Sequence, residues 1–214
     1  PFSFIVFGSE GREEQTLHTD QDNAIIYEDV DSEREETVRR YFLSMGEKVC
    51  TWLNDAGYTF CYGNNMAMNP EYCQPLSAWK QYFSRWVNMG SAEDLLRTKI
   101  FFDFRSAYGE EAFEDALRDH LNQIVGDNHR FFQLLARNIL PMAPPIGLFG
   151  NFIVESSGAN RGSFDIKSSM MPIVDFARIY ALKNKIRAAN TIRRLDALRR
   201  HRHKHGSVRH EASD

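Results

Sequence analysis

The sequence predicts an α/β (α+β) domain with a small mixed sheet, followed by a mainly α-helical domain. Apolar, aromatic and β-branched runs of strand length occur in the first half, as in FSFIVF (2–7) and NAIIY (23–27). After Gly109 the apolar residues instead recur at helical spacing. The change from one pattern to the other indicates two structural parts.

We therefore expect one domain over residues 1–108 and a helical one over 109–200, with a disordered basic tail over 201–214. Residues 183–214 carry ten Lys or Arg against three Asp or Glu, although the whole chain has a net charge of -3. The basic segment 183–214 lacks the interleaved aromatic residues on which nucleic-acid bases stack. We interpret it as a solvated face and do not expect nucleic acid as a partner.

Further elements follow in order through the first half. Behind Ser32, apolar residues recur at helical spacing until Gly57, a residue that commonly ends helices. The segment 58–62 is predicted as a third strand and IFFDFR (100–105) as another. Between these two, an amphipathic helix is expected from Leu76.

Shorter helices complete the prediction. Ser91 with Asp94 is typical of a helix start, because each side chain can bond the backbone of the other. Apolar stripes predict three more helices, over about 113–124, 127–139 and 171–188.

Composition excludes several classes of protein. No run approaches the roughly 20 apolar residues of a membrane span, so no membrane partner is expected. The three cysteines are odd in number, and no pair has the spacing of zinc ligands. We interpret them as thiols in a reducing cytoplasm, where we expect the protein to be located.

The chemistry is concentrated in one motif, Gly8-Ser9 after the first strand and Asp20-x-Asp22 before the second. Side chains two residues apart on a strand point to the same face, about 6–7 Å apart. Two such carboxylates repel unless a cation bridges them. Oxygen ligands of this kind suit Mg²⁺ or Mn²⁺, which nucleotides bring with their phosphates.

The residues around this turn suit a nucleotide. Gly8 allows the backbone to approach a phosphate closely, and Ser9 adds a hydroxyl. Arg12, one helical turn further, could bind a phosphate with two hydrogen bonds. Taken singly, a Gly-Ser turn or an Asp at a cap is common, whereas the combination is specific.

The stretch GSEGREEQTLHTDQDNAIIYED (8–29) resembles the nucleotidyltransferase-fold proteins related to DNA polymerase β. It is closest to the nucleotidyltransferases that accompany CBS and cyclic-nucleotide-binding modules in bacterial signalling proteins, and is similar to protein uridylyl- and adenylyltransferases. The resemblance continues through IFFDFR (100–105). FDIKSSMMPIVDFARIYAL (164–182) resembles the substrate-binding domain that follows the catalytic one.

By this resemblance, Gly8 and Ser9 match the phosphate motif of the superfamily, and Asp20 and Asp22 match its two metal-binding aspartates. The resemblance implies a nucleoside triphosphate substrate and a Mg²⁺ or Mn²⁺ cofactor. It also implies a protein as a candidate acceptor and attached CBS or cyclic-nucleotide-binding modules as candidate partners.

The superfamily usually has a third carboxylate, often the general base, where this sequence has Gly63. Asp103 is the best substitute for that catalytic carboxylate, and the alternative is that Asp103 pairs with Arg105 or Lys99. The predicted function is metal-dependent transfer of a nucleotidyl group from a nucleoside triphosphate to an acceptor hydroxyl. The alternative is a non-catalytic nucleotide-binding sensor, which loss of the third carboxylate would favour.

Overall fold

A computed structural model describes residues 1–16, 19–139, 154 and 162–211. The chain forms two compact units. The first comprises Pro1–Asp127 with Arg187–Asn190, and the second Asn128–Ile186 with Thr191–Asp214. The helix over 111–125 belongs to the first unit, and the domain limits proposed from sequence remain a prediction.

The first unit is built on a four-stranded sheet of β1 (Phe2–Val6), β2 (Asn23–Tyr27), β3 (Cys73–Pro75) and β4 (Arg105–Gly109). The strand order is β3-β2-β1-β4. Strand β1 pairs antiparallel with both β2 and β4, whereas β2 pairs parallel with β3. This is the small mixed sheet that the sequence predicts.

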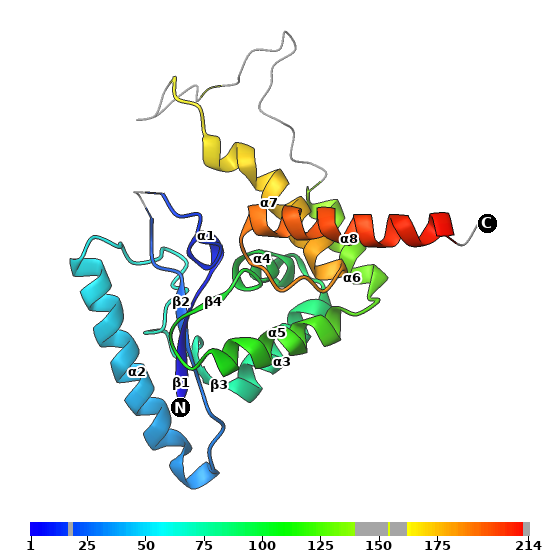
Figure 1. Cartoon of the computed structure of the whole chain (residues 1–214). Coiled ribbons are helices and arrows are strands. Elements are labelled where there is room, and N and C mark those ends of the chain that lie inside the picture. The colour runs from blue at the N-terminus through cyan, green and yellow to red at the C-terminus, as the bar shows by residue number, and fades with distance from the viewer. Residues whose placement is uncertain (17–18, 140–153, 155–161, 212–214) are drawn as a thin grey trace. The chain divides into compact units, whose positions relative to one another are not determined.

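Helices cover both faces of this sheet (Figure 1), with α2 (Ser32–Asp55) on one face and α3 (Leu76–Met89) and α5 (Glu111–Val125) on the other. Helix α2 ends just before Gly57, as predicted. The short helix α1 (Gly8–Gly11) follows β1, and α4 (Ala92–Phe101) begins at the predicted capping box. There, Ser91 Oγ accepts a hydrogen bond from the Asp94 amide at 3.1 Å.

Two apolar layers hold the sheet between its helices. On the α2 side, Ile25 and Tyr27 pack with Phe42, and the Tyr27 and Phe42 rings stack at 4.9 Å. The other layer is aromatic and fully buried, and it comprises Phe7, Trp79, Phe83, Trp86, Phe101, Phe102 and Phe104. Because both faces are buried, a one-residue slip of a central strand would place its side chains against the wrong layer.

The second unit is helical where it is described, with α6 (His129–Ile139), α7 (Ile166–Lys183) and α8 (Thr191–Glu211). Helix α7 packs against both α6 and α8. Helix α8 continues to Glu211 and so includes residues 201–211 of the tail predicted from sequence, whose disorder remains a prediction. Residues 212–214 of the predicted tail lie outside the described residues.

Two predicted strands differ from the structure. In the segment 58–62 only Thr59 forms a bridge, a parallel one with Asp20. The stretch 100–105 contains the end of α4 and the start of β4, with Asp103 between them. An unbroken apolar run fits a buried helix end as well as a strand, so its pattern alone does not separate the two.

Across the described part of the chain, no helix combines the length and the apolar character needed to cross a bilayer.

Gly46 lies in the middle of α2 against the backbone of the loop at Ala67. A Cβ at Gly46 would lie 2.3 Å from the Ala67 carbonyl oxygen. Replacing a helix glycine by alanine normally stabilises by up to about 1 kcal/mol. Here we expect Gly46→Ala to lower the free energy of unfolding by about 1–3 kcal/mol, because backbone must move. Urea denaturation checks this, with the exposed Ser44→Ala as control. A gain in stability for Gly46→Ala would contradict the packing.

The three cysteines are free and buried. Burial raises the pKa of the Cys73 thiol to about 12, so Cys73 stays neutral in the folded chain well above pH 9. In the unfolded chain a thiol ionises near pH 8.5. The raised pKa therefore contributes stability that is present below about pH 8.5 and is lost as the pH rises toward 12.

We expect the free energy of unfolding to fall more steeply between pH 8 and pH 10 in the unmodified chain than in Cys73→Ala. Denaturant titrations at a series of pH values measure both slopes, and differences in slope do not depend on the cavity that alanine leaves. Equal slopes would show that Cys73 ionises alike in the folded and unfolded states.

Candidate functional site

The pairing of β1 with β2 places the Gly8 turn beside Asp22. Val6 pairs with Asn23, and the ladder continues for one more residue, where the Phe7 amide donates to the Asp22 carbonyl oxygen at 2.9 Å. Gly8 has a φ of +55°, and a Cβ there would lie 3.3 Å from Asp22 Oδ2. Glycine thus provides the left-handed turn and leaves space beside the carboxylate.

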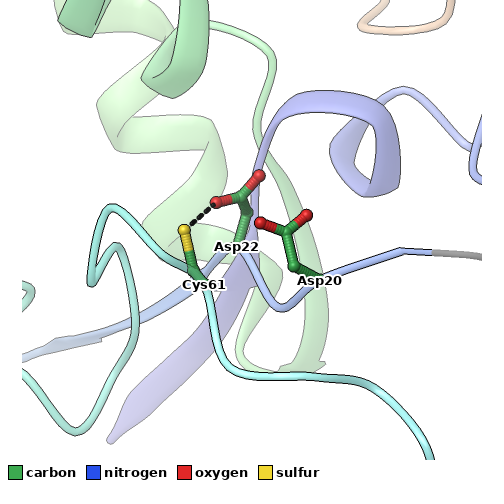
Figure 2. Close-up of side chains that lie close together, drawn as sticks. All are labelled: Asp20, Asp22 and Cys61. Carbon is green, nitrogen blue, oxygen red and sulfur yellow. Dashed lines mark hydrogen bonds between the residues drawn. The ribbon is translucent and has the colours of Figure 1, made fainter. Parts of the chain in front are cut away.

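Asp20 and Asp22 lie on the segment that leads into β2, with their carboxylates close together (Figure 2). Both side chains are partly exposed, whereas the alternating Gln21 and Asn23 are buried. This is the period of two expected of an extended chain. The acidic residues therefore face the site while their amide neighbours face the core.

The two buried amides hold this segment in place. Gln21 Nε2 donates to the carbonyl oxygens of Cys50 at 2.9 Å and Tyr58 at 2.8 Å. Asn23 Oδ1 accepts a hydrogen bond from the Ala67 amide at 2.8 Å. Buried polar groups of this kind fix one arrangement, because leaving any of them unpaired is costly.

A cysteine completes the cluster. Cys61 Sγ lies 3.3 Å from Asp22 Oδ1 and donates a hydrogen bond to it, as Figure 2 shows. Ligand atoms of Asp20, Asp22 and Cys61 all lie within 4.8 Å of one another, and no other such group occurs among the described residues. Burial, with the nearby Asp22 charge, raises the pKa of the Cys61 thiol to about 11. The thiol is therefore neutral at pH 7.

The donor set of this cluster fits a hard divalent cation on its carboxylate side. Oxygen ligands from one or two carboxylates are the usual protein contribution to a Mg²⁺ site. Sulfur ligands favour metals softer than Mg²⁺ or Mn²⁺. Asp20 and Asp22 are thus the residues suited to Mg²⁺ or Mn²⁺, and Cys61 is suited to holding Asp22 in position.

Helix α1 brings a further carboxylate to the site. Burial raises the pKa of Glu10, the positive charge of Arg105 lowers it, and the negative charge of Asp22 raises it again. Glu10 therefore lies within the electrostatic reach of Asp22. Ser9 is partly exposed, and its carbonyl oxygen accepts from the Glu14 amide at 2.8 Å, which closes the turn after α1.

Arg12, expected at the phosphates, and Asp103, expected as the catalytic third carboxylate, bind each other in the structure. Arg12 Nη1 donates to Asp103 Oδ2 at 2.8 Å, and both side chains are buried. Asp103 lies outside the metal-ligand cluster. Its place after α4, rather than within a strand, directs it to Arg12.

The structure therefore brings together Gly8, Asp20 and Asp22 of the expected residues and adds Cys61. Sequence reasoning missed the supporting amides, Gln21 and Asn23. The signal for them was present in DQDN, where acidic and amide side chains alternate at the strand period.

Comparison with known proteins gives two family matches along the chain. The family model described as "Putative nucleotidyltransferase DUF294" matches residues 1–93, which include the Gly8 turn and both aspartates. The model described as "Putative nucleotidyltransferase substrate binding domain" matches residues 129–212. No curated protein and no solved structure matches the chain. By these two matches, which follow one another along the chain, it belongs to the family of putative nucleotidyltransferases and has their substrate-binding domain.

Proposed function

We propose that this chain transfers a nucleotidyl group from a nucleoside triphosphate to an acceptor hydroxyl, with a divalent cation held by Asp20 and Asp22. Family membership supports nucleotidyl transfer in general. The observation that carries the metal-dependent form is the convergence of the two carboxylates beside the Gly8 turn.

In this reaction the acceptor hydroxyl loses its proton to water and its oxygen attacks the α-phosphorus, the bond from that phosphorus to the bridging oxygen breaks, and pyrophosphate leaves. When bound, a Mg²⁺ or Mn²⁺ ion would supply stabilisation of the negative charge on the attacking and leaving oxygens. Asp20 and Asp22 would hold that cation, and the amides of Gln21 and Asn23 keep the two carboxylates in register. Gly8 and Ser9 would border the phosphates, Gly8 by its lack of a side chain and Ser9 by its hydroxyl.

We further propose that the acceptor is a protein and that the reaction serves signalling in the cytoplasm. The match of residues 129–212 to a substrate-binding domain supports an acceptor that has a domain of its own for binding. CBS or cyclic-nucleotide-binding modules would then regulate access to the same site.

A second candidate is a sensor that binds the nucleotide without turnover. One observation favours it: the cluster has two carboxylates and a neutral thiol, and Asp103 is committed to Arg12. A missing general base typically slows a reaction by about 10²–10⁴-fold. Nucleotide binding without covalent labelling of any acceptor would favour the sensor.

Transfer should depend on Asp22. With α-labelled nucleoside triphosphates, Mg²⁺ and a protein extract as the source of acceptors, we expect Asp22→Asn to reduce covalent labelling by at least about 100-fold. The reason is the loss of several kcal/mol of charge stabilisation in the transition state. Pyrophosphate release, measured in parallel, should fall equally.

The matched control is Asp127→Asn, which removes one exposed carboxylate from the loop after α5. It should label as the unmodified chain does, and all variants should melt at similar temperatures. Undiminished labelling by Asp22→Asn would refute the assignment of the metal ligands.

A further inference from the structure

We propose that Arg105, and not Arg12, is the arginine that binds the phosphates of the nucleotide. This inference rests on the proposed function, because it assigns a residue to the same nucleotide site. It starts from the different surroundings of two arginines that both lie close to α1.

The side chain of Arg12 already binds two carboxylates of the chain. Its Nη1 binds Asp103 Oδ2 and its Nε binds Glu14 Oε2, each at 2.8 Å, and its side chain is only 9% exposed. Its backbone carbonyl oxygen accepts from Asn190 Nδ2 at 2.8 Å. Arg12 is thus held at both its side chain and its backbone.

Releasing Arg12 toward a ligand would be strongly unfavourable. Asp103 is 0% exposed, so releasing Arg12 would break a buried ion pair, which is strongly destabilising. The turn is also closely packed there, since a Cβ at Gly11 would lie 2.0 Å from the Asp103 carbonyl oxygen. The Arg12–Asp103 pair therefore positions α1 and does not serve as a mobile phosphate ligand.

Arg105 lies at the same end of the sheet as the two carboxylates. It opens β4 and pairs with Val6 of β1, and Val6 pairs on its other side with Asn23, next to Asp22. Its Nη2 reaches the Glu10 carbonyl oxygen of α1 at 3.4 Å. The sheet register thus places this guanidinium beside the turn that begins at Gly8.

The present partners of Arg105 leave it able to take a phosphate. Its side chain is 35% exposed, and its carboxylate partner is Glu13, 3.9 Å from Nε and itself 41% exposed. Exposed pairs at such a distance contribute little to stability. A phosphate would instead offer paired oxygens to the planar guanidinium, which is the stronger interaction.

Electrostatics supports the assignment. The segment from Glu10 to Asp22 carries five carboxylates against the single cation Arg12, which is already neutralised. A triphosphate entering this region needs positive charge besides that of a metal ion. The positive charge of Arg105 lowers the pKa of Glu10, and the negative charge of Asp22 raises it. Both charged groups therefore lie close enough to Glu10 to act on it.

Calorimetric titration with each of the four ribonucleoside triphosphates in Mg²⁺ buffer tests the proposal, with the matching nucleosides as reference. We expect Arg105→Gln to weaken triphosphate binding by roughly 10- to 100-fold, the value of one or two hydrogen bonds to a charged group. Nucleoside binding and melting temperature should be unchanged, and Arg105→Lys should bind with intermediate affinity.

The contrasting variant is Arg12→Gln, which should lower the melting temperature by roughly 5 °C or more, because it breaks the buried ion pair with Asp103. If the unmodified chain binds a triphosphate and Arg105→Gln binds it equally well, Arg105 is not the phosphate ligand and the proposed function stands. If the unmodified chain binds none of the four, the proposed function fails, and this proposal fails with it.

Discussion

One hydrogen bond beyond the regular ladder, from the Phe7 amide to the Asp22 carbonyl oxygen, determines how the site is assembled. It keeps β1 and β2 paired until the chain turns at Gly8, so the turn and the Asp22 carboxylate meet. The register behind it is fixed, because both faces of these strands are buried against different helices. A slip of one residue would turn both aspartates toward the core and both amides toward solvent.

The polar residues around the site divide into two groups with different physical tasks. Gln21, Asn23 and the Arg12–Asp103 pair are buried and fully engaged, so they define the positions of the backbone. Asp20 and Asp22 are partly exposed and remain able to exchange solvent for a ligand. This division links the fold to the proposed chemistry, since a metal site needs ligands that are both placed and accessible.

Much of this arrangement could be predicted from sequence. Local signals were sufficient for β1, β2, the capping box at Ser91 and the end of α2 before Gly57, and they located Asp20 and Asp22 before a strand. Long-range effects were not predictable: β3 is only three residues long and depends on its pairing with β2. Likewise, the partner of Arg12 is 91 residues away, and only the packing of α1 against the loop after α4 brings Asp103 to it.

The central claim is that Asp20 and Asp22 hold a divalent cation together with a nucleoside triphosphate. The most direct measurement is the water-proton relaxation rate of Mn²⁺ with a nucleoside triphosphate, titrated with the protein. A ternary complex slows the tumbling of the ion, so the unmodified chain and the control Asp127→Asn should enhance relaxation, whereas Asp20→Asn and Asp22→Asn should not. Equal enhancement by all four proteins would contradict the account, because the ion would then be held elsewhere.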